Sequence, residues 1–346
     1  MFKKSKAIVS MIMVFSLMFA TGCNSTTGPS SSAGQDGSSA EGNNEVIVAK
    51  MSHSSAVDST YDVGAKYFAD LVDEYTNGTV QIDVFPNAQL GSDRDALEGQ
   101  RMGTVDISLP GASMLTMYEP SIGVFNLPFL FADKEEVYST LDGEVGQEIF
   151  SSIETQGLRV LSTFESGFRQ VSTVSTPVTS LSDVSGLKVR IPDGDAYLNT
   201  WEALGANPTV IAWNETFTAL QTNVVEGVEV PITSFADAGL SEIAHHFSYI
   251  NYMYDPVVLI VSQTFWDKLS TEQQEAVQKA ATEASAYERQ YNSDLEEELQ
   301  TQLESEGVTF YNPDLSEFQA AVQSIYDEYE YQDELNAILD FLGRST

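Results

Sequence analysis

Arg190 is the residue whose position most needs a chemical explanation, because this charged residue lies in the apolar run GLKVRIPDG between Val189 and Ile191. The chain carries only 16 Lys and Arg against 51 Asp and Glu, so its cations are few. A guanidinium in a buried strand is costly unless it is paired. Two interpretations are open. Arg190 meets water or a neighbouring carboxylate on the other face of its strand, or it binds a ligand that carries a negative charge.

The residues that enzymes commonly use are scarce or scattered. The sequence contains one cysteine and three histidines, and it lacks the motifs HExxH and GxSxG and the phosphate-binding P-loop. Carboxylate pairs such as Asp93 and Asp95 fit general acid–base catalysis, but a chain with 51 acids contains such pairs by chance. We therefore expect a binding protein that is not an enzyme and has neither cofactor nor metal. An extracellular hydrolase with paired carboxylates is the less favoured alternative.

The composition limits the kinds of partner. A length of 346 residues suffices for two ordinary domains of about 100–200 residues each, and 42% hydrophobic residues can form real cores. The formal net charge of −35 excludes nucleic acid as a partner, because phosphate contacts need clustered Lys and Arg. The same charge argues against docking on an anionic membrane surface.

The first 44 residues indicate export and attachment to a membrane. Residues 1–22 have a basic start and an apolar run of about 14 residues, too short for a membrane span of about 20, and predict a secretory signal peptide. The sequence ATGC resembles a bacterial lipobox, so residues 23–44 are expected to be a lipidated Cys23 and a flexible Ser/Gly/Thr-rich linker. We expect an extracytoplasmic protein, lipid-anchored to the outer face of the cytoplasmic membrane. An ordinary signal peptide with an unrelated cysteine is the alternative.

The hydrophobic pattern of the remaining chain predicts two sets of alternating strands and helices. Alternating apolar residues mark strands, and apolar residues at intervals of three or four mark helices. This order indicates α/β layers with mostly parallel sheets. The expected strands are residues 45–52, 80–84, 105–109, 158–164, 188–192, 209–211 and 224–230, and the expected helices are 61–72, 92–101, 197–204 and 214–221.

One long helix is the clearest single element. Ser270 and Gln273 form a capping-box pattern, and neither Gly nor Pro follows until Gly307. About 35 residues at ~1.5 Å each give about 50 Å, more than the width of a small domain. The helix must therefore pack along both α/β units, which we expect to be joined by crossing strands and separated by a cleft. Its apolar side is expected to consist of Ala276, Ala280, Ala284, Tyr287, Tyr291, Leu295, Leu299 and Leu303.

Six stretches together resemble the DctP-like solute-binding proteins of TRAP (tripartite ATP-independent periplasmic) transporters. They are FPNAQLGSDRDALEGQRMGTVDIS, FNLPFLF, ESGFRQVST, LSDVSGLKVRIP, LGANPT and NETFTALQTNVVEGVEVP, which follow in the family's order. The resemblance covers nearly all of the chain from about Glu45 onward. It implies an α/β, two-lobed, periplasmic-binding-protein-like fold with one long helix spanning both lobes. It also implies capture of a small organic anion, usually a carboxylate, and its delivery to TRAP membrane permease subunits.

The resemblance assigns ligand-binding roles to particular residues. In the family the arginine of the GLKVRIP stretch, here Arg190, binds the ligand carboxylate, and the arginine of the GFR stretch, here Arg169, lines the site. A structural salt bridge is the alternative for each. Trp213 stands where the family commonly has an aromatic residue near the ligand, with core packing as the alternative. The family often has Asn where this chain has Val230, and Gly111 stands where some members have a polar side chain.

Four further residues are candidates for the site. Ser52 and His53 follow the first predicted strand, where a loop residue often reaches the ligand. Asn207 is expected in a turn at the edge of the cleft. Glu165 either accepts a hydrogen bond from a ligand hydroxyl or holds Arg169 in place.

The resemblance also sets the expected domains and partners. Residues 45–166 with 257–297 are expected to form lobe I, and residues 167–256 with 298–346 lobe II. The expected partners are a small organic-acid ligand and the permease, with the membrane contacted only through the lipid anchor. A binding or sensing protein that serves an ABC permease or a receptor is the alternative.

Overall fold

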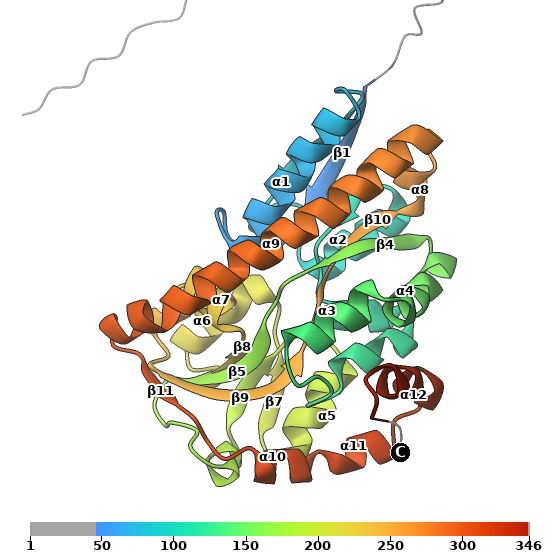
Figure 1. Ribbon diagram of the computed structural model, residues 1–346. Helices are drawn as coiled ribbons and strands as arrows, with labels where there is room; N and C mark the ends of the chain where they lie inside the picture. Colours follow the sequence, from blue (N-terminus) through green and yellow to red (C-terminus); the bar gives the residue numbers. More distant parts are fainter. Residues whose placement is uncertain (1–45, 345–346) are drawn as a thin grey trace, which may run out of the picture. The chain divides into compact units, whose positions relative to one another are not determined.

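Two β-sheets form the framework of the protein. The computed structural model describes residues 46–344 and shows a mixed α/β fold (Figure 1). Sheet A has the strand order β2-β1-β3-β10-β4, and sheet B has the order β11-β9-β5-β8-β6-β7. The strands of sheet A are β1 (Ile47–Ser52), β2 (Val80–Phe85), β3 (Ile107–Ser108), β4 (Leu158–Phe164) and β10 (Val257–Ser262), and those of sheet B are β5 (Phe168–Thr173), β6 (Lys188–Ile191), β7 (Asn207–Val210), β8 (Gly227–Val230), β9 (His246–Tyr254) and β11 (Thr309–Tyr311).

Strand direction follows from how each pair is connected. β1 pairs parallel with β2 and β3, and β6 pairs parallel with β7 and β8, with helices between these strands in the chain. β10 pairs antiparallel with β3 and β4, and β5 pairs antiparallel with β8 and β9. The expected parallel pairing therefore holds where a helix returns the chain to the same end of a sheet. Both sheets as a whole are mixed.

The expected crossing strands join the two sheets. Only residues 165–167 separate β4 of sheet A from β5 of sheet B, and only residues 255–256 separate β9 of sheet B from β10 of sheet A. The first connection runs from sheet A to sheet B, and the second runs back. Because the two pass in opposite directions, β4 lies antiparallel to β10 and β5 lies antiparallel to β9.

The helices begin close to the predicted positions. The capping box of α2 is present, since Ser92 Oγ accepts the Asp95 N–H and the Asp95 carboxylate accepts the Ser92 N–H at 2.8 Å. The helix expected from Asn214 begins only at α6, after a short 3-10 turn. The α-helices are α1 (Thr60–Tyr75), α2 (Asp93–Met102), α3 (Lys134–Asp142), α4 (Glu144–Ser151), α5 (Asp195–Ala203), α6 (Thr216–Gln221), α7 (Ile232–Asp237), α8 (Gln263–Trp266), α9 (Thr271–Ser305), α10 (Ser316–Ala321), α11 (Gln323–Asp327) and α12 (Gln332–Phe341), and the 3-10 helices are η1 (Ala112–Met117), η2 (Pro120–Asn126), η3 (Ser152–Gln156), η4 (Leu181–Val184), η5 (Trp213–Glu215) and η6 (Leu240–Glu242).

The long helix α9 backs both sheets, as predicted. It is 35 residues long, and its predicted capping box of Ser270 and Gln273 is present. Its first half packs on α1 and β4, where Ala280 and Ala284 belong to the core of sheet A. Its second half packs on α7, where Leu299 and Leu303 belong to a core beside sheet B. Figure 1 shows α9 running diagonally past both sheets.

The middle of α9 is polar, which corrects the prediction of a continuous apolar side. Tyr287 and Tyr291 are 42% and 36% exposed, and the buried positions there are Glu288 and Asn292. These two side chains face the connection between β4 and β5. The Glu288 carboxylate accepts the N–H of Glu165 at 2.7 Å, and Asn292 Nδ2 donates to the Glu165 carbonyl at 3.4 Å. Where a strand leaves its sheet, its backbone groups lose their hydrogen-bond partners in the neighbouring strands. The polar side chains of α9 supply hydrogen-bond partners at this point.

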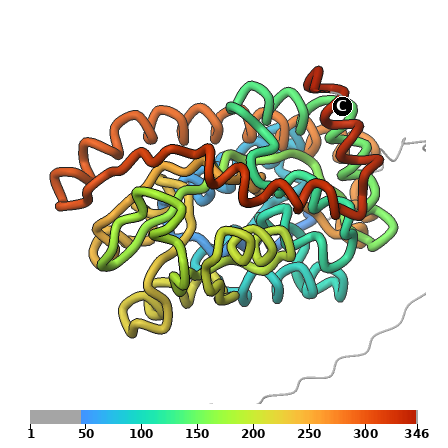
Figure 2. The backbone as a smooth tube through the Cα atoms, turned by 90° about the horizontal axis from the view of Figure 1, so that it is seen from below, coloured from blue at the N-terminus to red at the C-terminus, as the bar shows by residue number. Residues whose placement is uncertain are grey.

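The C-terminal segment returns along the folded part after α9. β11 joins the edge of sheet B next to β9, and the chain then continues through α10 and α11 to α12 (Figures 1 and 2). In α12, Leu335 and Ile338 belong to an apolar cluster that also contains Val258 and Ile260 of β10. The segment thus touches elements beside both sheets. The predicted boundaries of lobes I and II stay a prediction.

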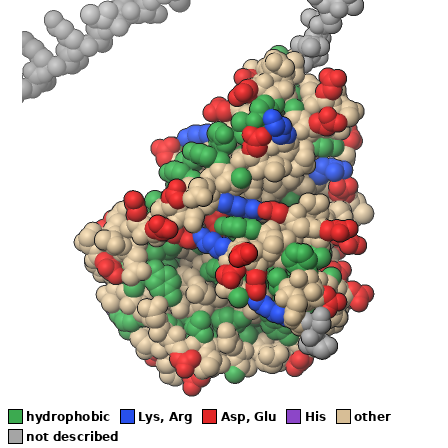
Figure 3. Space-filling model, in the orientation of Figure 1, with side chains coloured by type: hydrophobic (Ala, Val, Ile, Leu, Met, Phe, Trp, Pro, Cys, Tyr) green, Lys and Arg blue, Asp and Glu red, His purple; other side chains and the backbone are tan. Residues whose placement is uncertain are grey.

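The surface reflects the acidic composition. Acidic side chains are spread over the face shown in Figure 3, and the few basic ones lie beside them. Two pairs are Lys134 with Glu296 at 2.5 Å and Arg289 with Asp142 at 2.5 Å. Within residues 46–344, no helix has the length and apolar character to cross a membrane.

Replacement of Glu288 by Gln should remove a pH-dependent destabilisation. Burial raises the pKa of Glu288 well above 4.5, so the folded protein holds a proton that the unfolded chain releases near that pH. The stability from this group is complete below about pH 4.5 and is lost as the pH rises through the raised pKa. Thermal unfolding should show a Tm gain for Glu288→Gln that is larger at pH 8 than at pH 5.

The exposed Glu298 of the same helix provides the matched control. Glu298→Gln changes the net charge equally and should show no such pH dependence. An equal Tm gain at both pH values in Glu288→Gln would contradict the assignment of a buried proton.

Candidate functional site

A cavity of about 250 Å³ lies among loops that belong to both sheets. Sheet A contributes the loop after β1 and the start of α2, and sheet B contributes β5, β6 and the residues after β7 and β8. These loops mostly follow the carboxyl ends of strands, the usual place for ligands in open α/β sheets. The lining residues that carry charge are Asp93, Arg94, Arg169, Arg190, Asp193 and Asp255.

Arg190 is a buried cation that forms no ion pair among the described residues, although the Glu229 and Asp93 carboxylates act on it electrostatically from further away. Its side chain comes from β6 and is 3% exposed. Nε donates to the Ile211 carbonyl at 2.9 Å, and the guanidinium lies 5.5 Å from the centre of the Trp213 ring. It forms no ion pair with any residue between 46 and 344. Burial lowers the pKa of Arg190 to about 10, so the group is still charged at neutral pH.

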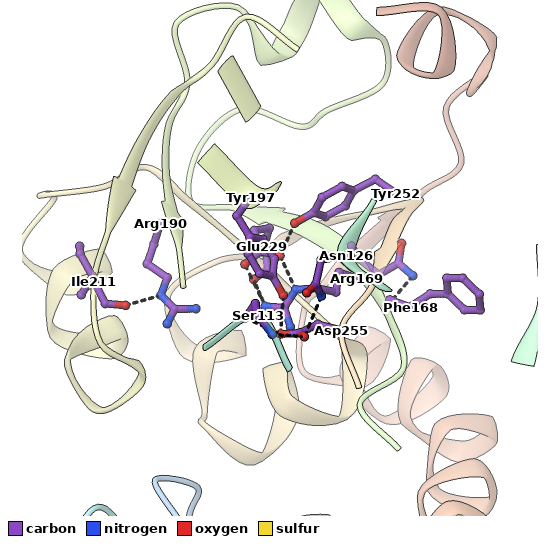
Figure 4. Close-up of polar contacts among 11 residues, drawn as sticks. Ser113, Asn126, Phe168, Arg169, Arg190, Tyr197, Ile211, Glu229, Tyr252 and Asp255 are labelled. Carbon is purple, nitrogen blue, oxygen red and sulfur yellow. Dashed lines mark hydrogen bonds and ion pairs between the residues drawn. The ribbon is translucent and has the colours of Figure 1, made fainter. Parts of the chain in front are cut away.

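Arg169 lines the same cavity but is already neutralised. Its Nε and Nη2 donate to the two carboxylate oxygens of Glu229 at 2.5 and 2.8 Å, and Tyr252 Oη donates to the same carboxylate at 2.6 Å. Burial by itself would lower the pKa of Arg169, but the Glu229 carboxylate raises it well above the usual value. Figure 4 shows this cluster, with Arg190 apart from it and bonded only to Ile211. The salt-bridge alternative therefore describes the contacts of Arg169.

The third arginine of the cavity is also paired. Arg94, at the start of α2, forms an ion pair with Asp193, which follows β6. The pair joins an element beside sheet A to one in sheet B. Of the three arginines that line the cavity, Arg190 alone has no carboxylate partner among the described residues.

Asp255 ties the connection between β9 and β10 to both sides of the cavity. Its carboxylate accepts hydrogen bonds from Ser113 Oγ at 3.0 Å, Asn126 Nδ2 at 2.8 Å and Tyr197 Oη at 2.7 Å (Figure 4). A Cβ on Gly111 would lie 2.4 Å from the Asp255 carboxylate, so no side chain fits there while Asp255 keeps this position. The absence of a side chain at Gly111 follows from this close approach.

Two of the predicted site residues, Trp213 and Val230, line the cavity. Trp213 lies in η5 and is partly exposed, and its ring packs against Arg190 rather than in the centre of a core. Val230 ends β8 and is fully buried, and it offers the cavity an apolar surface. Because valine has no polar side-chain atom, this wall has no side-chain donor at position 230.

Ser52 and His53 do not line the cavity. Both are 1% exposed, at the end of β1 and just after it. His53 Nε2 lies 3.2 Å from the Asp62 carboxylate. Burial lowers the pKa of His53 despite the carboxylate, so the imidazole is neutral at neutral pH. The next residues in the chain, Ser54 and Ser55, are the ones that reach the cavity.

Glu165 and Asn207 also lie outside the cavity lining. Glu165 is fully buried in the connection between β4 and β5, where it accepts a hydrogen bond from Tyr138 and lies 3.9 Å from Lys134. No bond from Glu165 to Arg169 is present, and burial raises the pKa of Glu165. Asn207 begins the edge strand β7, and its Nδ2 donates to the Gly186 carbonyl at 3.0 Å.

Sequence reasoning missed several lining residues. Asp93 begins α2 and accepts a hydrogen bond from Ser54 Oγ at 2.8 Å, and burial raises the pKa of Asp93 to about 6. In the sequence, the loop expected after the first strand was the feature that could have indicated Ser54 as a lining residue. The pair of Arg94 and Asp193 joins residues 99 positions apart and has no local signal.

The sequence analysis also led to expectations about a lipidation site and about metal binding. Cys23, the predicted lipidation site, lies outside the described residues. Within residues 46–344, no group of three or more His, Cys, Asp or Glu side chains is placed to hold a metal ion.

The family follows from comparison with known proteins. The sequence pattern of the DctP family, bacterial extracellular solute-binding proteins of family 7, matches residues 51–333. The chain belongs to this family. The predicted resemblance to DctP-like TRAP solute-binding proteins is confirmed, as is the two-lobed α/β fold with its long helix. This DctP-family protein is thus a member of a family of bacterial extracellular solute-binding proteins.

Some relatives of this DctP-family protein are named as, or have been solved as, binding proteins for acids. It is 33% identical over 282 residues to the C4-dicarboxylate-binding periplasmic protein DctP of Rhodobacter capsulatus, covering 81% of this chain and 84% of the relative. A TRAP solute-binding protein from Polaromonas, bound to D-erythronate, has a TM-score of 0.82 and 32% identity, covering 84% of this chain and 98% of that one. One from Xanthobacter autotrophicus, bound to β-D-galacturonate, has a TM-score of 0.81 and 31% identity, with coverages of 84% and 98%.

Removal of Arg169 should destabilise the fold. Arg169→Met leaves the Glu229 carboxylate buried without its cation, which is expected to cost about 3–5 kcal/mol in the free energy of unfolding. The double variant Arg169→Met/Glu229→Gln removes both charges and should regain part of that loss. Urea unfolding followed by circular dichroism measures both. An equal loss in the single and double variants would show that the unpaired charge is not the cause.

Proposed function

We propose that this protein binds its organic acid with the carboxylate on Arg190, in the cavity between the loops of the two sheets. The observation that carries the proposal is the state of the three cavity arginines. Arg94 and Arg169 have carboxylate partners, and Arg190 has none among the described residues. A planar guanidinium matches the two oxygens of a carboxylate and stays charged when desolvated. Arg190 can therefore accept an anionic ligand without losing an ion pair.

The surroundings of Arg190 strengthen this interaction. The Trp213 ring packs against the guanidinium, the buried Val230 adds an apolar surface to the same cavity, and water is largely excluded from Arg190. Opposite charges attract more strongly where the local dielectric constant is low. The net charge of −35 does not cancel this attraction, because surface charges are screened over about 8 Å at physiological ionic strength.

Capture is proposed to involve closure of two lobes around the ligand. Residues 165–167 and 255–256 connect the sheets, and such element-terminal segments commonly serve as hinges. The ligand would favour the closed form only by its greater affinity for that form. The loaded protein would then deliver the acid to TRAP membrane permease subunits, the partner implied by the family, and would act as a binding protein rather than an enzyme. Lipidation of Cys23 would keep it beside the permease.

Truncation of Arg190 should abolish tight binding. Arg190→Ala is expected to weaken binding of a hydroxylated carboxylic acid such as D-erythronate or D-galacturonate by about 2–5 kcal/mol, because the buried carboxylate would lose its charged partner. Isothermal titration calorimetry measures the change. The Tm should fall less than in Arg169→Met, since Arg190 loses one hydrogen bond to a backbone carbonyl and its packing on Trp213 but no ion pair.

The exposed Lys188 on the same strand offers a matched control, since Lys188→Ala removes one positive charge outside the cavity. It should bind the acid like the parent protein. Binding by Arg190→Ala that equals the parent's would overturn the proposed site.

The proposed anchor has its own test. In cells that process lipoproteins, Cys23→Ser should move the protein from the membrane fraction to the soluble fraction. The substitution removes the thiol to which the lipid would be attached, and stable anchoring needs more than one acyl chain. Fractionation followed by immunoblotting measures the shift. A Cys23→Ser protein that stays in the membrane fraction would contradict lipidation at this residue.

A further inference from the structure

One exposed ion pair joins the two sheets beside the cavity that contains Arg190. It is formed by Arg94 of α2 and Asp193, two residues after β6, whose side chains are 48% and 42% exposed. α2 packs against β3 and β10 of sheet A, whereas β6 belongs to sheet B. Both residues line the cavity, and no other ion pair within residues 46–344 joins two residues that line it. The pair therefore ties the sheets together where the cavity wall meets solvent.

The loop that carries Asp193 lies close to the elements of sheet A. Its next residue, Gly194, has a φ of 147°, a positive value that favours glycine. A Cβ on Gly194 would lie 3.2 Å from Ser113 Cβ, and Ser113 belongs to η1 beside β10 of sheet A. This close approach of the backbone brings Asp193 within reach of Arg94.

The other polar contacts between the two sides of the cavity are buried. Asp255, which is 4% exposed, lies in the connection between β9 and β10 and accepts hydrogen bonds from Ser113, Asn126 and Tyr197. Separation of this cluster would leave buried polar groups without partners, which is costly. The charges of Arg94 and Asp193 would instead be hydrated when they separate, so their pair can break at little cost. The exposed pair is thus suited to form and break as the cavity closes and opens.

Asp193 can influence a bound anion in two ways, and the two have opposite signs. Its carboxylate lines the same cavity as Arg190, so it repels an anion held there. Through this direct effect alone, removal of the Asp193 charge would strengthen anion binding. Through its pair with Arg94, Asp193 stabilises the arrangement in which the loops of the two sheets enclose the cavity. Loss of that pair would weaken binding, because a ligand that prefers the closed form would find it less populated.

We propose that Arg94 and Asp193 are positioning residues that form a latch across the opening of the cavity. The pair forms when the two lobes close, holds the loops of the two sheets together and slows release of the bound acid. This inference rests on the proposed function, because it takes the lobes to close around an anion on Arg190. It adds that the residence time of the acid is controlled by a contact between the sheets, outside the ligand's own contacts.

Release rates test the latch. Asp193→Arg turns the attraction to Arg94 into repulsion and should raise the release rate constant about three- to tenfold, although the added positive charge would by itself retain an anion. Arg94→Asp should raise it by a similar factor. The probe is whichever of D-erythronate, D-galacturonate and succinate binds the parent protein most tightly. Stopped-flow tryptophan fluorescence, to which Trp213 beside Arg190 contributes, gives the association and release rate constants from the observed rate at several acid concentrations.

A charge exchange separates the latch from a direct contact of Arg94 with the ligand. The double variant Arg94→Asp/Asp193→Arg restores an ion pair with its charges exchanged, so its release rate should return to within about twofold of the parent's. A direct contact of Arg94 with the acid would not be restored in this variant.

Glu226→Arg is the matched control. Glu226 is exposed, pairs with Lys188 within sheet B and does not line the cavity. The substitution changes the net charge as Asp193→Arg does and should keep the release rate within about twofold of the parent's. Raising NaCl from about 0.05 to 0.5 M should bring the release rate of Asp193→Arg closer to the parent's, because exposed charges are screened.

The outcomes separate the latch from the proposed function. If Asp193→Arg releases the acid as slowly as the parent or more slowly, if the double variant is not restored, or if high salt leaves the difference undiminished, the latch is wrong. If Arg190→Ala loses binding while these release rates are all equal, the proposed function stands and the latch alone fails. If none of the three acids binds the parent, or Arg190→Ala binds as the parent does, the proposed function fails and the latch fails with it.

Discussion

A buried positive charge that forms no ion pair with any described residue is the constraint around which the cavity is organised. Removing a guanidinium from water is expensive, and most buried arginines recover the energy through a carboxylate. Arg169 does so with Glu229, in a bidentate pair supported by Tyr252. Arg190 instead has only a backbone carbonyl and the Trp213 ring. The fold holds the desolvated cation in place without an ion pair. An anionic ligand can therefore supply the electrostatic attraction that offsets the cost of removing the guanidinium from water.

The framework of the protein accounts for how such a charge can be held. The loops that surround it come from two sheets, and the sheets are tied together by short crossing connections and by α9. Each connection has its own polar support. Glu288 and Asn292 of α9 bind the backbone of Glu165 in one connection, and Ser113, Asn126 and Tyr197 bind Asp255 in the other. At the first connection, polar residues of α9 stand where the flanking parts of the helix pack through apolar residues.

The walls of the cavity differ in chemistry from one end to the other. Near Arg190 they combine one available charge with the apolar surfaces of Trp213 and Val230. Beyond Trp213 they consist of small polar side chains, an aromatic ring and an acid, without a cation. Relatives of comparable similarity are named for a C4-dicarboxylate or bound to D-erythronate or β-D-galacturonate. Family membership therefore leaves the ligand open, and the distribution of charge within the cavity is what can discriminate among such acids.

The sequence by itself determined the local elements and the family. The strands β1 to β4 and β6 to β8, the capping box of α2 and the full extent of α9 could be predicted because they depend on neighbours within a few residues. The strands β5, β9, β10 and β11 were not predicted. The motif GLKVRIP singled out Arg190 in the same way. Only the tertiary structure decided which cavity arginine has no ion pair among residues 46–344, since the partners of Arg169 and Arg94 lie 60 and 99 positions away in the chain. It also decided that the centre of α9 is polar and that Ser54 and Ser55, rather than Ser52 and His53, reach the cavity. Periodicity reports which face of an element is buried, but the charge or backbone group that this face meets is set by elements far away in sequence.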